Sequence, residues 1–205
     1  MTTIDRIEGF DEIERKLRKL PHIAQKATVS ALNKIGAQAA TQVKKEIRAT
    51  YNIKLKDLTG QIKLIRAKGG SAGQLFAVIH GAGRPISLYK FAPRPTEPQA
   101  QAGVPVRKRK AVSVKVLKQG GRKTLPHAFL VRAKGAATPS IFAREGKSRL
   151  PIKRLLTVGI AKMFEKEGIP AAREVTRTKG KAIILHELDF YLKKEAGLLP
   201  ARGKA

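Results

Sequence analysis

The sequence contains no cysteine and no tryptophan, and aromatic residues make up only 5% of its 205 residues. Without cysteine, disulfides and thiolate metal sites are excluded, and a reducing compartment is permitted. Apolar runs such as Ala182–Leu185 are far too short to span a bilayer. The first residues, Met1-Thr2-Thr3-Ile4-Asp5, lack the basic and apolar regions of a signal peptide. We therefore expect a soluble protein that is made in the cytoplasm and has no membrane partner.

Acidic residues are scarce in the middle of the chain. Fifteen of the 54 residues in the range Gln101–Arg154 are Lys or Arg, and Glu145 is the one acid among them. This basic section carries +14 of the net charge of +28, which predicts a strongly anionic partner, with phosphate as the first candidate. Between Asp57 and Glu165 the only acids are Glu97 and Glu145. The section therefore cannot build a multi-carboxylate metal site alone, and a two-metal nuclease is not expected.

Motifs that would indicate catalysis are absent from the sequence. The four histidines are scattered, and none has the spacing of a metal-binding motif: His22, His80, His127 and His186. Gly81-Ala82-Gly83 follows a predicted strand, but the third glycine of a dinucleotide-binding motif is missing. Neither a Walker-type lysine motif nor a Gly-x-Ser-x-Gly elbow occurs. We predict that the protein is not an enzyme and that it uses no cofactor and no metal.

Apolar residues at helical spacing predict helices at both ends of the chain. The predicted helices cover Phe10–Leu20, His22–Thr50 and Gly159–Lys166, and a longer one runs from Pro170 to a stop at Gly197. In the long N-terminal helix the apolar stripe is Leu32, Ile35, Ala39, Val43 and Ile47. The Ala-rich middle of this helix would let a sheet or another helix approach closely.

Alternating apolar residues and glycine turns predict strands between the helices. The strands are expected over Ile62–Leu64, Leu75–His80, Ile86–Phe91, Val112–Val116, Ala128–Ala133 and Ser140–Arg144. We expect them to join in one sheet. The order of elements then gives an α+β fold, with an antiparallel sheet and basic hairpins packed against a long N-terminal helix and C-terminal helices. The predicted divisions are an N-terminal helix (1–20), an α+β domain (21–167) and a C-terminal helix with a basic tail (168–205).

The candidate binding residues are the cations that surround one predicted hairpin, with its turn at Gly120-Gly121. They are Arg107, Lys108, Arg109, Lys110, Lys115, Lys118, Arg122 and Lys123. Long cationic side chains on a hairpin suit contact with phosphates without reading bases. The tyrosines lie far apart in sequence and no recognition helix is predicted, so we expect no aromatic stacking platform and no sequence-specific recognition. A single charge run is usually a solvated loop, but the accumulation of cations favours an anionic partner.

Several segments carry a resemblance to a known family. They are the helix Val29–Gly36 with the turn Tyr51–Lys54, the segment Pro85–Phe91, and the run His127-Ala128-Phe129, Ile141–Arg144 and Arg149–Ile152. The pattern resembles the prophage minor tail protein Z family, the tail-completion proteins of long-tailed phages, over about residues 25–165. In this pattern a strand is followed by a second strand that ends in Arg144. A basic segment that contains Pro151-Ile152 then leaves the second strand.

The resemblance implies a virion protein at the head-proximal end of a tail, made in the host cytoplasm. Such proteins are thought to form rings, here expected as a hexamer, next to the tail terminator, the tail tube and the head–tail connector. Genomic DNA passes through the ring at ejection, and no catalytic motif is implied. Arg144 and Arg149 would lie between subunits or at the lumen. Two alternatives remain open: a free, non-specific nucleic-acid-binding protein of the nucleoid or ribosome, and an enzyme that acts on nucleic acid.

Overall fold

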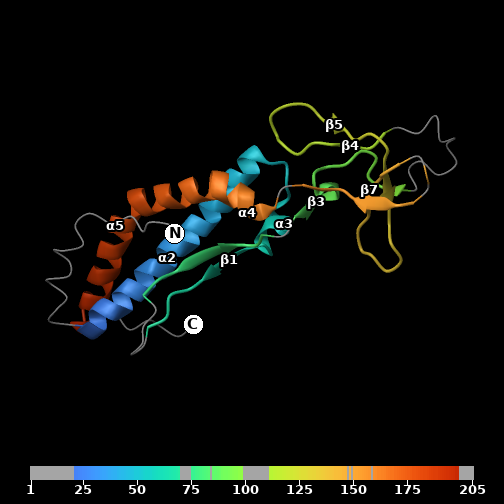
Figure 1. Cartoon of the computed structure of the whole chain (residues 1–205). Coiled ribbons are helices and arrows are strands. Elements are labelled where there is room, and N and C mark those ends of the chain that lie inside the picture. Colours follow the sequence, from blue (N-terminus) through green and yellow to red (C-terminus); the bar gives the residue numbers. More distant parts are fainter. Residues whose placement is uncertain are drawn as a thin grey trace. The chain divides into compact units, whose positions relative to one another are not determined.

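The computed structural model describes residues 21–69, 75–83, 85–98, 111–146, 148, 150–157 and 159–198 (Figure 1). In chain order its elements are α2 (Pro21–Thr50), α3 (Leu55–Thr59), β1 (Ile62–Ile65), β2 (Val78–Gly81), β3 (Ile86–Ser87), the 3-10 helix η1 (Leu88–Lys90), β4 (Ser113–Val114), β5 (Lys123–Thr124), β6 (Ala128–Val131), β7 (Ser140–Arg144), β8 (Ile152–Arg154), β9 (Leu156–Thr157), α4 (Ile160–Met163), the π-helical turn η4 (Phe164–Gly168) and α5 (Ile169–Glu195). The α+β class is confirmed. The predicted helix Phe10–Leu20 lies outside the described residues.

The chain divides into two compact units. We call the first the helical unit; it consists of Met1–Val43, Lys63–His80 and Ile169–Ala205. We call the second the strand unit; it consists of Lys44–Ile62 and Gly81–Gly168. The boundaries predicted after residues 20 and 167 stay a prediction.

In the helical unit, α2 and α5 lie side by side (Figure 1). Pro21 begins α2, at a position where its missing N–H costs no helical hydrogen bond. Side chains spaced by helical turns then form one buried cluster, in which α2 contributes Ala27, Ala31 and Ile35 and α5 contributes Ile184 and Leu188. The apolar stripe predicted for the long helix is confirmed from Ile35 to Ile47. Small alanines in the cluster let the two helices approach closely.

The sheet formed by β1 and β2 packs against α2 through Gly36. A Cβ atom on Gly36 would lie 2.9 Å from Cδ1 of Leu64, so any side chain there would have to push the Leu64 side chain aside. Three residues earlier, Asn33 holds the segment that follows β1: its Nδ2 donates to the carbonyl of Ala67 (3.1 Å), and its Oδ1 accepts from the N–H of Ala67 (2.8 Å). The close approach predicted for the middle of this helix is therefore confirmed, and a glycine provides the room.

A carboxylate is buried in the packing of α2 against α5. The side chain of Glu187 is only 3% exposed, and Ser30 donates a 2.6 Å hydrogen bond to its Oε2. Lys34 forms an ion pair with Oε1, and Nδ1 of His186 lies 3.2 Å from the same oxygen. Burial alone would raise the pKa of Glu187, but the hydrogen bonds from Lys34, Ser30 and His186 and the charge of Lys34 outweigh it and lower the pKa below its usual value.

The strand unit is built from small antiparallel sheets, β3–β9, β4–β5 and β6–β7–β8. Its core cluster contains Val112 and Val114 from the β4 segment and Ile141 from β7. The side chain of Phe91 is also fully buried in this unit, at 0% exposure. The backbone around it is also bonded, since its N–H donates to Leu88 (3.1 Å) and its carbonyl accepts from the N–H of Lys115 (3.0 Å).

Two details of the predicted secondary structure are wrong. The described strands form four separate small sheets and not one, with the orders β1–β2, β3–β9, β4–β5 and β6–β7–β8. The strand predicted over Ile86–Phe91 ends at Ser87, whose Oγ accepts from the N–H of Tyr89 (3.4 Å) and starts a 3-10 turn. Both predicted C-terminal helices are present: α4 and η4 cover most of Gly159–Lys166, and α5 begins at Ile169, one residue before the predicted start at Pro170. The π-helical turn η4 ends at Gly168, two residues before this proline.

Candidate anion-binding surface

The predicted basic hairpin exists as β4–β5. Ser113 pairs with Thr124 and Val114 with Lys123 in antiparallel register. Val114 is 2% exposed and fastens the hairpin to the core, while Gly120, with a φ of 91°, adopts the left-handed conformation that the turn requires. The predictions of a strand, a glycine turn and a hairpin are confirmed here, although the paired part is shorter than Val112–Val116.

The loop of this hairpin is anchored to the segment that follows α2. The N–H of Asn52 donates to the carbonyl of Val116 (2.8 Å), and its Nδ2 donates to the carbonyl of Lys115 (3.1 Å). The N–H of Lys118 donates to the carbonyl of Thr50 (2.9 Å). Next to these bonds Tyr51 is 8% exposed, so its ring belongs to the core. The backbone of the loop is therefore hydrogen-bonded to Thr50 and Asn52 at Lys115, Val116 and Lys118, and the lysine side chains take no part in these bonds.

The structure separates the candidate cations into groups. Lys118 and Lys123 are exposed, and among the described residues neither forms an ion pair. Lys115 and Arg122 are half-buried. Arg107, Lys108, Arg109, Lys110 and Arg149 lie outside the described residues. Arg144 belongs to β7, in another sheet from the hairpin. Within the part of the chain that is described, Lys118 and Lys123 are thus the hairpin cations best placed to meet an anion.

Arg122 has an internal role. Its Nη2 donates to the carbonyls of Ala92 and Ser113, the latter at 3.1 Å, and its Nε donates to Oγ of Ser113 at 3.3 Å. Burial, followed by repulsion from the nearby Arg94, lowers the pKa of Arg122 below its usual value. The guanidinium therefore fastens the hairpin to the loop at Ala92. The sequence could not distinguish this arginine from its lysine neighbours.

We predict that Arg122→Gln lowers the free energy of unfolding by about 1.5 kcal/mol, because hydrogen bonds from a charged donor to two carbonyls are lost. The matched change Lys123→Gln removes the same charge from an exposed neighbour and is expected to cost no more than about 0.5 kcal/mol. Urea unfolding of the two variants measures the difference. Equal stabilities would show that the arginine contacts contribute nothing.

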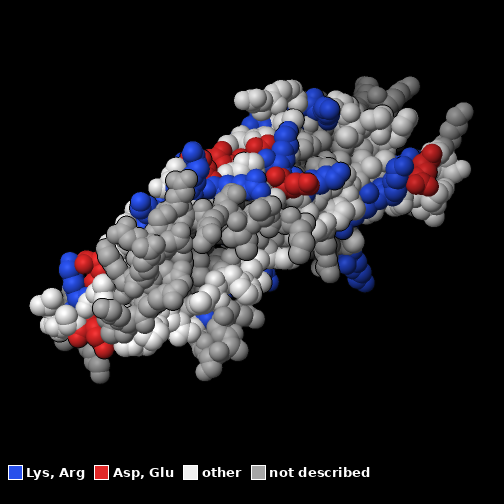
Figure 2. All heavy atoms as spheres, turned by 60° about the vertical axis from the view of Figure 1, so that its left-hand side comes forward, with Lys and Arg blue, Asp and Glu red and all other residues white. Residues whose placement is uncertain are grey.

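Several other cations of the strand unit are already compensated by carboxylates. Lys90 pairs with Asp57 at 2.8 Å, Arg132 with Glu97 at 2.6 Å, and Lys153 with Glu145 at 3.8 Å. On the face seen in Figure 2, Lys and Arg lie directly beside Asp and Glu at several places. These pairs use both acids of the range 58–164, Glu97 and Glu145.

The sequence analysis missed an aromatic pair on β6 and β7. The rings of Phe129 and Phe142 stack with centroids 6.5 Å apart, and the guanidinium of Arg144 lies 5.4 Å from the centroid of Phe129. The expectation of no aromatic stacking platform was drawn from the tyrosines alone and did not consider these phenylalanines. The pair could have been predicted from strand pairing, since a hairpin over 128–144 places residue 129 opposite residue 142.

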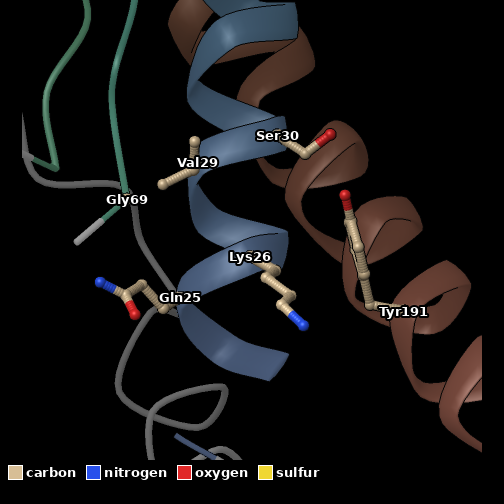
Figure 3. Close-up of a pocket in the computed structure, with 6 residues that line it drawn as sticks. All are labelled: Gln25, Lys26, Val29, Ser30, Gly69 and Tyr191. Carbon is tan, nitrogen blue, oxygen red and sulfur yellow. The ribbon is translucent and has the colours of Figure 1, made fainter. Parts of the chain in front are cut away.

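A hollow of about 500 Å³ lies in the helical unit, lined by Gln25, Lys26, Val29, Ser30, Gly69 and Tyr191. In Figure 3, Lys26 and Ser30 point from α2 toward the side of Tyr191, whereas Gln25 and Val29 point toward Gly69. Its lining contains no carboxylate, and we assign it no ligand. Over the described residues no three His, Cys, Asp or Glu side chains gather as metal ligands, and no helix is long and apolar enough to cross a membrane.

Comparison with known proteins gave one finding. A family model described as prophage minor tail protein Z matches residues 7–194, which is most of the chain. Neither the search of curated proteins nor the search of solved structures returned a match.

Proposed function

Because the chain belongs to the prophage minor tail protein Z family, and is therefore a structural protein of a phage tail, we propose that it completes the tail at the end that faces the head. There it forms a ring, with the tail terminator, the tail tube and the head–tail connector as neighbours. The family match over 7–194 carries this proposal, since it includes every described helix and strand except the last residue of α5. The proposed role is structural, and no step of it requires catalysis.

The basic hairpin gives the ring its contact with DNA. Lys118 is exposed on a loop whose backbone is bonded to Thr50 and Asn52, and Lys123 is exposed on β5, paired with Val114, so both present positive charge at defined positions. Lysine side chains bind phosphate oxygens of any sequence, and each phosphate neutralised adds about 0.9 to the salt dependence on duplex DNA. A surface of this kind admits a genome end without recognising its bases. It acts through electrostatics alone.

The DNA contact is tested in particles, with a variant that carries Lys118→Gln, Lys123→Gln and Gln in place of Arg107–Lys110. Arg122 is kept because it stabilises the fold. We expect tails to assemble in normal numbers while DNA delivery into cells falls by at least about tenfold, as the loss of several phosphate contacts implies. The control, Lys179→Gln with Lys181→Gln, removes exposed lysines from α5 and leaves delivery unchanged.

Two outcomes would contradict the proposal. Normal DNA delivery by the hairpin variant would show that these cations do not face the DNA path. Tails that fail to join heads would show that the hairpin binds an acidic protein neighbour. The ring is tested separately by measuring the mass of the purified protein and of isolated tails, where a monomer in both would rule it out.

A further inference from the structure

The sheet β6–β7–β8 has one face in the core and one face outside it. Side chains of a strand alternate between the faces, and directly paired residues share a face. Ile141 and its neighbours Ala128 and Leu130 pack into the core cluster. The opposite face therefore carries the residues that alternate with them along the strands. On this face Phe142 is paired with Phe129 on one side and with Arg154 on the other, and Arg144 is paired with Ile152.

This outer face combines aromatic rings with arginines. Phe129 and Phe142 are half-buried and stacked at 6.5 Å, and the exposed Arg144 lies over the ring of Phe129. Arg154 is exposed beside Phe142, and Ile152 is 38% exposed. We call the set of Phe129, Phe142, Arg144 and Arg154 the arginine–phenylalanine face. The residues that share the face by register are Phe129, Val131, Ser140, Phe142, Arg144, Ile152 and Arg154, and none of these is acidic.

We propose that the arginine–phenylalanine face binds single-stranded nucleic acid. Unpaired bases stack on phenyl rings and on guanidinium planes, and the same arginines bind the flanking phosphates. Duplex bases are already stacked on each other and cannot use the rings. The charge of the surroundings fits this occupant, since the strand unit contains 25 Lys or Arg and six Asp or Glu, a net charge of +19. An acidic peptide would use the arginines but would gain little from paired phenyl rings.

This inference goes beyond the proposed tail function, because the face lies in a different sheet from the hairpin and prefers a different form of nucleic acid. The hairpin cations bind phosphates of any strand. The arginine–phenylalanine face adds a preference for bases that are free of a partner. Failure of one site therefore leaves the other untouched, and the two are tested with different variants.

The test measures the fluorescence anisotropy of a labelled oligothymidylate of about 16 nucleotides, and of a duplex of equal length, with the full chain. We expect Phe142→Leu to weaken single-strand binding about tenfold while duplex binding stays unchanged, because one stacked base is lost. Phe142→Tyr keeps an aromatic ring and should bind as the wild type does. Arg154→Gln should lower the salt dependence of single-strand binding by about 0.7, the value for one phosphate contact.

Thermal unfolding checks that these variants are folded, and Arg154, being exposed, provides a change that does not touch the core. Equal single-strand binding by wild type, Phe142→Leu and Arg154→Gln would overturn the proposal. So would an equal loss of duplex and single-strand binding in Phe142→Leu. If the wild type binds no oligothymidylate but self-associates, and Phe142→Leu abolishes the self-association, the face is an interface between copies and the proposal is wrong.

Discussion

Replacing Phe91 by alanine is expected to lower the free energy of unfolding by about 4 kcal/mol. The phenyl ring is 0% exposed and is the largest fully buried side chain among the described residues. Its removal costs the transfer of the ring from water and leaves a cavity, because the backbone on both sides is fixed by hydrogen bonds to Leu88 and Lys115 and cannot close the gap. Urea or thermal unfolding measures the loss.

The control for this prediction is Phe190→Ala. Phe190 is 42% exposed on α5, so the same chemical change should cost no more than about 1 kcal/mol. Equal losses in the two variants would mean that Phe91 is not a core residue. The expected difference would also explain why the segment Pro85–Phe91 that resembles the family ends in a phenylalanine, since this residue is fully buried.

Glu187→Ala is expected to destabilise the protein by about 3 kcal/mol, at the lower end of the range for breaking a buried ion pair. The carboxylate is 3% exposed, whereas its partner Lys34 is 54% exposed and stays hydrated after the change, which limits the loss. Ser30 would also lose its acceptor. The control Glu174→Ala removes an exposed carboxylate of the same helix, paired with Arg177, and should cost less than about 0.5 kcal/mol.

The stabilisation by Glu187 depends on pH in a direction that follows from its lowered pKa. A carboxyl whose pKa is lower in the folded state contributes stability above its unfolded pKa of about 4.3, and loses that contribution as the pH falls through the folded value. The difference in stability between wild type and Glu187→Gln should therefore be constant near neutral pH and shrink below about pH 4. Thermal unfolding of both proteins across pH measures it. A difference that grows in acid would contradict the assignment.

Secondary structure was predictable wherever periodicity was strong. The stripe from Ile35 to Ile47 defined α2, and glycines at Gly120 and Gly135 marked turns that adopt positive φ, 91° and 78°. The 3-10 turn after Ser87 was not predictable from alternation, because it depends on the side chain of Ser87 competing for a backbone N–H. The division into small sheets could not be predicted from the sequence either, since alternation shows which residues face a core but not which strand is the partner.

The candidate surface was predictable in its charge and not in its detail. Composition indicated the positive charge, and the alternation of valines with the glycine turn indicated a hairpin, which the pairing of β4 with β5 confirms. Which cations are available depends on hydrogen bonds between distant residues, such as those of Arg122 to Ala92, thirty residues away. The stacked phenylalanines depend on strand register in the same way. Sequence patterns report local periodicity, and both of these features arise only when remote segments meet.

The anchoring of the hairpin loop to Thr50 and Asn52 has a kinetic consequence. A basic arm that orders on binding gives up about 1–2 kcal/mol of conformational entropy for each residue it fixes. The loop before Lys118 is already ordered, so a polyanion that reaches it requires no folding step. Only exposed lysine side chains then need to move, which they do in picoseconds to nanoseconds. If the hairpin contacts DNA as proposed, a nucleic acid strand would exchange one phosphate for the next and slide across the hairpin while the backbone stays still.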